Sequence, residues 1–345
     1  MTPRMSSYGV PRRSRLQPVT LDSTDDIRQS DMLILGPAID IWGLRSKHFR
    51  NLAPVTSCYH GVKNNLIASM RPVFQAAQPS LVTHHCFVIG SDVCEKLAIE
   101  NPNTTFVTVC HSSQAHLATS PQWMSNQARH LLLARDLPNF YYATPDERMQ
   151  HSLAAPESKC LHWPNPIRDI GEHTTEWPKK PVAALIGRHD VIKNMPTQLL
   201  AVAIAGIKQV QLICRPHDSQ KRSLIELCDA YGIDATFHWF EWEDHIANMA
   251  SNVSVVMQAS FSESFNYVAL ESMLTGTPVI GSPAIRYLPK QWQANPDDAD
   301  DISHILRTVL DDLPQSSQLA LATGRLVASS QNYAYSRLIT KLAYS

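Results

Sequence analysis

Short apolar runs alternate with amphipathic segments along most of this chain, a pattern typical of strands and helices that follow one another. In the first half, residues 32–36, 80–83, 105–110 and 140–144 are predicted to be strands, bounded by polar or glycine-containing loops. Helical patterns separate these runs. A strand, helix, strand order predicts parallel sheets with helices packed on their faces.

The same pattern restarts near residue 180. Strands are predicted at 181–187, 210–214, 235–239 and 253–257, with a helix starting near Pro196 and another at 219–231. The chain has 345 residues, and a length of roughly 100–200 residues per domain favours two domains. We therefore expect an N-terminal domain over 31–165 and a C-terminal domain over 166–325, each a doubly wound parallel sheet. A basic, irregular arm over 1–30 precedes them.

Two glutamates with seven residues between them, Glu263 and Glu271, form the most informative part of the sequence. A helix is predicted over 264–275, because Gly276 and Pro278 follow the apolar pattern and stop it. Its rise would separate the two carboxylates by roughly 12 Å. The unpaired N–H groups of Ser264, Phe265 and Asn266 would form its positive end, which suits a diphosphate. The alternative is an amphipathic helix with two exposed glutamates.

The segment 263–280 resembles the motif of the retaining GT-B glycosyltransferases, the large E-x7-E or family 4-like group that includes sucrose and trehalose synthases. The resemblance implies a GT-B fold, in which two Rossmann-like domains face a central cleft. It also implies that Glu263 holds hydroxyls of the donor sugar and Glu271 the ribose. One departure is Asn266, which stands where the family usually has glycine; asparagine tolerates left-handed backbone geometry better than most residues.

A second segment, from Gly187 to Asn194, resembles the Gly-Arg-x(4)-Lys-Gly/Asn element of the same family. The resemblance implies that Arg188 and Lys193 bind the diphosphate. A leaving nucleoside diphosphate gains negative charge as the glycosidic bond breaks, and two cations would stabilise that charge where it develops. The alternative is a pair of ordinary solvated loop cations.

In the N-terminal half, His111 follows a predicted strand and resembles the family's histidine near the transferred sugar. His84 and His85 follow another predicted strand and are weaker candidates; a structural role is the alternative for all three. Gly43 lies in the loop after the first strand, where the family carries glycines, although a plain strand-loop-helix unit fits as well. The C-terminal segment 326–345 resembles the family's closing helix, which crosses back to the N-terminal domain.

Composition narrows the chemistry. The formal charge is −1, so no global field attracts nucleic acid or an anionic membrane. Seven cysteines, an odd number without a C-x-x-C pair, argue for a reducing compartment rather than a disulfide framework or zinc site. No apolar run reaches membrane-spanning length and no signal-peptide core is present, so a cytoplasmic location is expected. The acidic run 297–301 precedes a predicted helix and is interpreted as a cap, not a metal site.

These patterns predict a retaining, metal-independent hexosyl- or pentosyltransferase that uses a nucleotide diphosphate sugar, such as a UDP-sugar, and no other cofactor. Glu263, His111, Arg188 and Lys193 are the candidate catalytic residues. The acceptor stays open: a glycan, a lipid, a protein, or a modified DNA base as in some phage glycosyltransferases, the only role in which nucleic acid would enter. The alternative function is a GT-B scaffold that binds a nucleotide or glycan without turnover.

Overall fold

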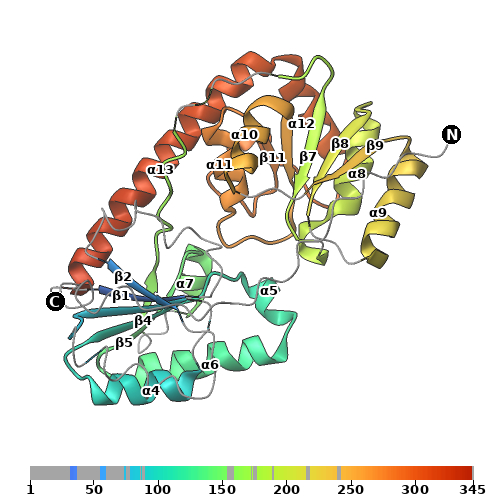
Figure 1. Cartoon of the computed structure of the whole chain (residues 1–345). Helices are drawn as coiled ribbons and strands as arrows, with labels where there is room; N and C mark the ends of the chain where they lie inside the picture. The colour runs from blue at the N-terminus through green and yellow to red at the C-terminus, as the bar shows by residue number, and fades with distance from the viewer. Residues whose placement is uncertain are drawn as a thin grey trace.

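The structure, a computed structural model, describes residues 32–36, 55–59, 74, 78–85, 87, 90–153, 159–171, 173, 177–188, 190–214, 218–238 and 242–343. Two parallel sheets, one in each half of the chain, organise these residues (Figure 1). The predicted arm over 1–30 and Gly43 lie outside the described residues.

The first sheet has six strands in the order β2-β1-β3-β4-β5-β6. They are β1 (Met32–Gly36), β2 (Val55–Tyr59), β3 (Leu81–His85), β4 (Thr105–Val109), β5 (Phe140–Thr144) and β6 (Cys160–His162). Four helices of this half are described: α4 (Ser91–Glu100), α5 (Gln114–Ala118), α6 (Pro121–Asp136) and α7 (Glu147–Leu153).

The second sheet has five strands in the order β11-β10-β7-β8-β9. They are β7 (Val182–Ile186), β8 (Gln209–Ile213), β9 (Asp234–His238), β10 (Val255–Gln258) and β11 (Val279–Gly281). The helices are α8 (Met195–Ile204), α9 (Asp218–Tyr231), α10 (Trp242–Asn252), α11 (Tyr267–Leu274), α12 (Ala299–Asp311) and α13 (Leu313–Ala343), with short 3-10 turns η1 (Val191–Lys193) and η2 (Lys290–Trp292).

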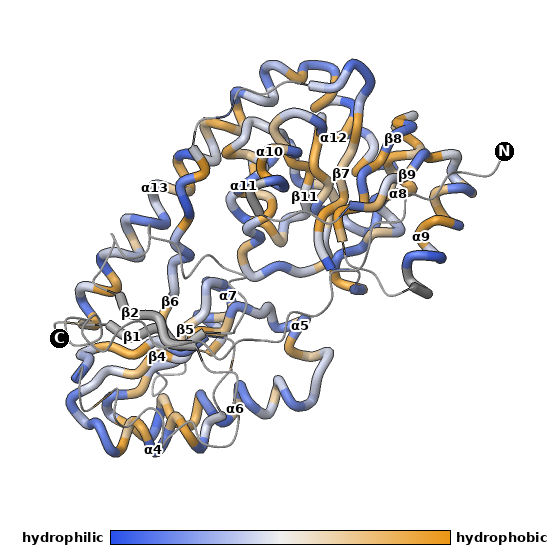
Figure 2. The backbone as a smooth tube through the Cα atoms, viewed as in Figure 1, coloured by the Kyte–Doolittle hydropathy of each residue, from blue (hydrophilic) through white to orange (hydrophobic). Residues whose placement is uncertain are grey.

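The central strands of the second sheet are apolar and buried, as expected for parallel strands covered on both faces. Every residue of β7 and of β10 is buried. In Figure 2 the strands β7 and β8 are mostly hydrophobic, whereas the helices around them alternate between hydrophobic and hydrophilic residues. All pairings between the described strands of both sheets are parallel. Two Rossmann-like sheets are therefore confirmed.

In strands β3 to β6 of the first sheet, alternate residues pack into two different cores, because successive side chains in a strand point to opposite sides. Val82 and Phe106 pack with α4 and α6 in one core. Leu81 and Val107 pack in the other, against the end of α13. Figure 1 shows α4 and α6 on one side of this sheet and α13 reaching it from the second half of the molecule.

α13 joins the two halves at three places. Gly324 lies against the C-terminal end of α11, where a β-carbon on it would come within 3.1 Å of the Leu274 backbone nitrogen. Further along, the Gln331 and Asn332 side chains accept hydrogen bonds of 2.7 Å from the backbone N–H groups of Asn165 and Ile167 in the connection between the sheets. The end of α13 then packs on the first sheet. The boundary expected at 325/326 falls inside this helix.

Two local predictions are wrong, the end of β3 and the start of α11, and a third, the helix cap in the acidic run, is confirmed. β3 extends to His85, so His84 and His85 lie within the strand rather than after it, where they pair with Thr108 and Val109 of β4. α11 begins at Tyr267 rather than 264. The capping interpretation of the acidic run is confirmed, since Asp298 accepts hydrogen bonds from the N–H groups of Asp300 and Asp301 at the start of α12.

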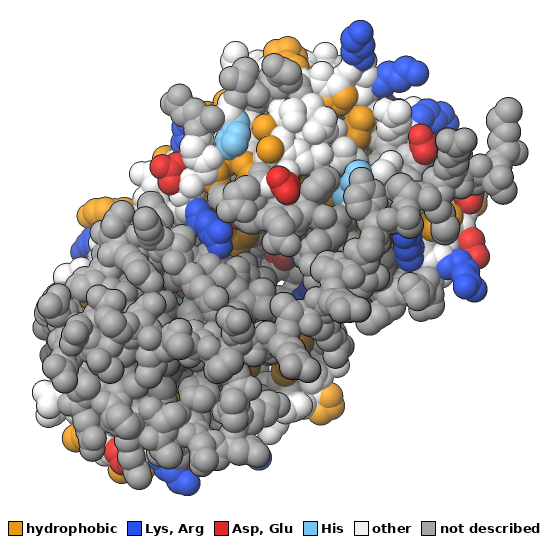
Figure 3. Space-filling model, in the orientation of Figure 1, with side chains coloured by type: hydrophobic (Ala, Val, Ile, Leu, Met, Phe, Trp, Pro, Cys, Tyr) orange, Lys and Arg blue, Asp and Glu red, His pale blue; other side chains and the backbone are white. Residues whose placement is uncertain are grey.

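The described cysteines are buried and are not joined in disulfides: Cys94, Cys110, Cys160, Cys214 and Cys228. Charges on the visible face are mixed. In Figure 3, the Lys and Arg side chains of the described residues are scattered among Asp and Glu rather than gathered into a continuous basic surface.

Candidate functional site

A cleft of about 470 Å³ lies between the two halves. From the first half it is lined by Gln114, Asp146, Arg148, Met149 and Ser152, and from the second by Phe261, Ser262, Ser282, Pro283, Ala284 and Pro296. Phe261 and Ser262, in the loop after β10, line one wall, and Glu263 directly follows them in the chain. The cleft therefore adjoins the segment that the sequence singled out.

Lys193 and Glu263 form a buried ion pair beside this cleft. The Lys193 Nζ atom donates to Glu263 Oε1 at 2.6 Å, and the two side chains are only 17% and 9% exposed. Asn266 Nδ2 donates to the same carboxylate oxygen at 3.1 Å. Taking two charges out of water is costly unless further hydrogen bonds satisfy them, and Asn266 supplies one. The sequence predicts that Lys193 and Glu263 bind different parts of the donor. In the structure the two side chains contact each other directly.

The topology explains why these two residues meet. β7 and β10 are neighbours in a parallel sheet, so the loops that follow them leave at the same edge. Two features of the loop after β7 then turn the chain: Gly187 has φ +145°, and Asn194 adopts the left-handed conformation. The Asn194 side chain donates to the carbonyl of Ala259 at 3.2 Å, and Phe261 N–H donates to the carbonyl of Ile192 at 2.8 Å. The two loops are thus tied together along their length.

Asn266 carries the left-handed turn that the family makes with glycine. Its φ is 75° and its Oδ1 accepts from the Ala269 N–H at 2.9 Å, so it caps α11. Its Nδ2 also donates to Gln258 Oε1 at 2.8 Å, and its carbonyl accepts from the Tyr287 hydroxyl. The side chain thereby links the end of β10, Glu263 and the helix. Asparagine compensates for the left-handed backbone with bonds that glycine cannot make.

Because α11 starts at Tyr267 rather than at 264, the N–H groups of its first turn belong to other residues than predicted. Ser264, Phe265 and Asn266 belong to the loop and cap, not to the first helical turn. Beyond the capped Ala269, the first-turn N–H groups are those of Tyr267 and Val268. Glu263 also precedes the helix, so the separation of about 12 Å from Glu271, which assumed a continuous helix, does not follow.

Glu271 lies half-buried on α11, one helical turn after Tyr267. Burial raises the pKa of Tyr267 well above its usual value, and the negative charge of Glu271 raises it further. The pKa of Tyr287 is raised by burial first and then by Glu263 and Glu271. The charges of both glutamates therefore act on Tyr287. The ring centroid of Phe265 lies 5.2 Å from those of Tyr267 and Tyr287.

Among the polar contacts that cross between the halves, two involve predicted site residues. Arg188 Nη2 lies 3.1 Å from His116 Nε2, and Ser264 Oγ donates to the carbonyl of His111 at 2.6 Å. Burial lowers the pKa of His116, and the charge of Arg188 lowers it further, which keeps the imidazole neutral and able to accept from the guanidinium. Arg188 itself is exposed and also pairs with Asp190 at 3.5 Å. His116 is missed by the sequence, because nothing in its neighbourhood marks it.

His111 and His85 form a stacked pair at the end of the first sheet. His85 Nδ1 and His111 Nε2 are 2.8 Å apart, and the rings lie 17° from parallel. Burial lowers the pKa of His111 to about 3 and that of His85 well below its usual value. Both rings are therefore neutral near pH 7, and one donates to the other. His84, the next residue along β3, instead contacts Cys94 of α4.

The structure thus gathers Glu263, Ser264, Phe265 and Asn266 with Lys193 in one place, and brings Arg188 and His111 to the boundary between the halves. Glu271 shares tyrosine neighbours with Glu263. Gly43 is the one predicted site residue outside the described part of the chain. Residues not anticipated are His116, Gln258 and Tyr287. Of these, only Gln258 carried a signal, as a polar residue ending a buried strand.

A comparison with protein families points to the same part of the chain as the candidate site. Residues 172–320 match the family described as glycosyl transferases group 1. The match covers the whole second sheet and every candidate residue of the second half. In sequence, this half of the chain is therefore similar to that glycosyltransferase family. No curated protein matches the chain in a sequence search.

Solved structures share the fold over nearly the whole chain. A glycosyltransferase from Rickettsia africae has 10% identity and a TM-score of 0.68, covering 92% of this chain and 100% of its own. HepE from Anabaena, solved with UDP and glucose, has 14% identity and a TM-score of 0.62, covering 90% and 100%. Sucrose-phosphate synthase from Thermosynechococcus elongatus has 18% identity and a TM-score of 0.60, covering 81% and 77%. The GT-B fold and the resemblance to GT-B glycosyltransferases are therefore confirmed.

None of the described helices has the length and apolar character needed to cross a membrane.

We predict that the Lys193–Glu263 pair stabilises the fold only as a pair. Glu263→Gln and Lys193→Met should each lower the free energy of unfolding by about 3 kcal/mol, because each leaves a buried charge without its partner. The double variant should lose less than the sum, with a coupling of about 1–3 kcal/mol. Urea unfolding of the four proteins measures this coupling. A parallel cycle on the exposed pair Arg135–Asp136, at 2.7 Å, should give a much smaller coupling, because water screens charges at the surface. Equal coupling in the two cycles would contradict the prediction.

We also predict an acid-sensitive contribution from His111. Its folded-state pKa of about 3 lies below the unfolded value of 6.5, so its contribution to stability is complete above pH 6.5 and is lost as the pH falls from there towards 3. Between about pH 7.5 and 5, the wild type should lose about 1–2 kcal/mol more than His111→Gln, allowing for partial solvent screening. Urea unfolding at each pH checks this, with His304→Gln on the exposed face of α12 as control. An unchanged acid slope in His111→Gln would count against it.

Proposed function

We propose that this protein is a retaining glycosyltransferase that uses a nucleotide diphosphate sugar, with a UDP-sugar as the first donor to test. The observation that carries the proposal is the cluster of Lys193, Glu263 and Asn266 at the edge of the second sheet. It lies within the part of the chain that matches a glycosyltransferase family. The neighbour HepE is described in complex with UDP-glucose, which supports the choice of donor.

The geometry suggests how the donor would be held. Tyr267 and Val268 offer first-turn N–H groups to an anion, and Lys193 lies near them through its bond to Glu263. Arg188 is exposed and can reorient from His116 and Asp190 towards a phosphate. Glu271 would accept hydrogen bonds from the ribose hydroxyls, and Glu263 from hydroxyls of the sugar. A bound diphosphate would compete with Glu263 for Lys193 and leave that carboxylate free to bind the sugar.

In the proposed reaction, the acceptor hydroxyl attacks the anomeric carbon on the face from which the phosphate departs. The bond from the anomeric carbon to the phosphate oxygen breaks, the bond to the acceptor oxygen forms, and the acceptor proton passes to the departing phosphate. Arg188 and Lys193 would stabilise the charge that grows on the leaving group. His111, neutral through burial, would orient an hydroxyl group by a hydrogen bond rather than transfer a proton. No metal at the donor site is part of this proposal.

A binding scaffold without turnover is the second candidate. It is favoured by Asn266, whose side chain fills the place of the family's glycine and is held by three partners. Incubation with radiolabelled UDP-sugars separates the two functions, since slow hydrolysis to free sugar reports a competent donor site even without the acceptor. Binding with no release of sugar from any donor would favour the scaffold.

We predict that Glu271→Ala weakens nucleotide binding. A hydrogen bond to a charged group is worth about 1.5–3 kcal/mol, or about 10- to 150-fold in the dissociation constant. Calorimetric titration with UDP, GDP and ADP measures the effect. Glu226→Ala on the exposed face of α9 is the matched control and should bind as the wild type does. Unchanged affinity of Glu271→Ala for all three nucleotides would remove Glu271 from the ribose site.

We further predict that Arg188→Ala lowers kcat more than it raises KM for the donor, because its partner is charge that develops in the transition state. A loss of about 100-fold in kcat is expected for one missing electrostatic contact. Arg222→Ala, a change of another exposed arginine in the same half, serves as control. A raised KM with unchanged kcat would show that Arg188 holds only the ground state.

A further inference from the structure

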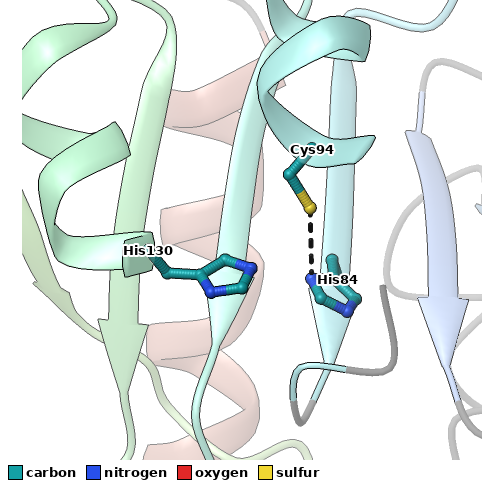
Figure 4. Close-up of side chains that lie close together, drawn as sticks. All are labelled: His84, Cys94 and His130. Atoms are coloured by element: carbon teal, nitrogen blue, oxygen red, sulfur yellow. Dashed lines mark hydrogen bonds between the residues drawn. The ribbon is translucent and has the colours of Figure 1, made fainter. Parts of the chain in front are cut away.

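Three side chains with metal-binding atoms converge in the first half of the molecule, away from the proposed donor site. His84 comes from β3, Cys94 from α4 and His130 from α6 (Figure 4). One ligand atom from each lies within 4.8 Å of the other two, and Cys94 Sγ is 3.7 Å from His84 Nδ1. All three residues are buried, with 4%, 4% and 0% of their surfaces exposed.

The orientation of His130 is that of a metal ligand. Its Nδ1 lies 2.7 Å from the carbonyl oxygen of Asn126, and since a carbonyl can only accept, Nδ1 carries the hydrogen. Nε2 is therefore unprotonated and presents a lone pair. Among the described residues, Nε2 has no hydrogen-bond partner. Metal-binding histidines are commonly fixed in this way, by a bond from the other ring nitrogen to a backbone carbonyl.

A small cavity adjoins two of the three side chains. It has a volume of about 10 Å³ and is lined by His84, Cys94, Thr108 and otherwise by apolar side chains. The Thr108 hydroxyl oxygen also has no partner among the described residues. Leaving a buried polar group without a partner costs about 1–3 kcal/mol. One such atom, on Thr108, faces the cavity, and the other, on His130, belongs to the cluster whose His84 and Cys94 line that cavity.

We propose that His84, Cys94 and His130 bind a thiophilic d10 metal ion, Zn²⁺ or Cu⁺. One thiolate and two imidazoles are ligands that both ions accept. Around such an ion, neighbouring ligand atoms stand about 3.5 Å apart, so the Cys94–His84 spacing already fits. The remaining spacings need a contraction of about 1 Å, within the reach of side-chain rotation.

Binding would change the protonation of Cys94. Burial raises the pKa of this thiol, so the free site holds a neutral thiol and metal binding releases its proton to solvent. With Cu⁺ the thiolate complex is neutral. With Zn²⁺ it carries one positive charge and takes a fourth ligand, for which the cavity beside Thr108 has about the volume of one water molecule.

The ion would fasten β3 to α4 and α6. It would also steady the strand that carries His85, the partner of His111. The ligands stand 10 and 36 residues apart in the chain, so no compact cysteine or histidine motif reveals them. This inference is independent of the proposed sugar transfer, because none of its residues belongs to the donor site.

Metal analysis of the full-length protein tests the proposal. The purified wild type, stripped with chelator and then exposed to Zn²⁺ or to Cu⁺ under reducing conditions, should retain about one equivalent of at least one ion after gel filtration. The retained ion should raise the melting temperature. Co²⁺ added to the stripped wild type should give a thiolate-to-cobalt charge-transfer band. This last measurement needs no variant, so it holds even if the substitutions below impair folding.

Cys94→Ser and His130→Gln should lose the retained ion and the cobalt band. Cys160→Ser, which changes another buried cysteine of the first half, and His304→Gln should keep both. Far-ultraviolet circular dichroism establishes that each variant is folded. Failure of the wild type to retain either ion, retention of Zn²⁺ without a cobalt band, or retention by folded Cys94→Ser would overturn the proposal.

Discussion

The Lys193–Glu263 ion pair is the interaction on which the second half of the site depends. It forms because two neighbouring parallel strands end at the same edge, and it survives burial because Asn266 shares the carboxylate. Asn266 in turn holds Gln258, whose amide donates to the Ile186 carbonyl at 2.7 Å. One polar network therefore runs from the end of β7 through β10 to the start of α11. If one member were replaced, its partners would be left buried without hydrogen bonds, which would cost stability. The geometry of the two loops therefore depends on the identity of each member.

The two cations that the sequence placed together behave differently in the structure. Lys193 is held inside the network, whereas Arg188 is exposed and reaches across to His116 in the other half. The lysine is thus positioned by the interior of one sheet and the arginine by the relation between the two sheets. Contacts such as Ser264 to His111 and Arg286 to Glu147 also span this boundary. The electrostatic environment of a ligand there depends on how closely the halves approach each other.

The sequence predicted the two sheets, the order of their strands along the chain and the segment around Glu263, because buried parallel strands and helix stop signals are local patterns. It placed the start of α11 three residues early, since a side-chain cap at a left-handed Asn266 has no local signature distinct from a first helical turn. It put His84 and His85 after β3 because the apolar run ends before them. In the structure, pairing with β4 extends the strand beyond its apolar residues. His116, Tyr287 and the His84–Cys94–His130 cluster arise only from tertiary contacts, which a linear pattern does not contain.

α13 is a rigid rod of 31 residues, about 46 Å long, with one end seated in each half. Gln331 and Asn332 bind the segment 165–167, which connects the two sheets, to the helix between its two ends. The helix and the connecting segment therefore cross at one fixed point. A rod held in this way resists stretching and shear between the halves but permits rotation about the crossing point. Opening and closing of the cleft should therefore follow a single swing axis, and the side chains farthest from that axis would travel the longest arc.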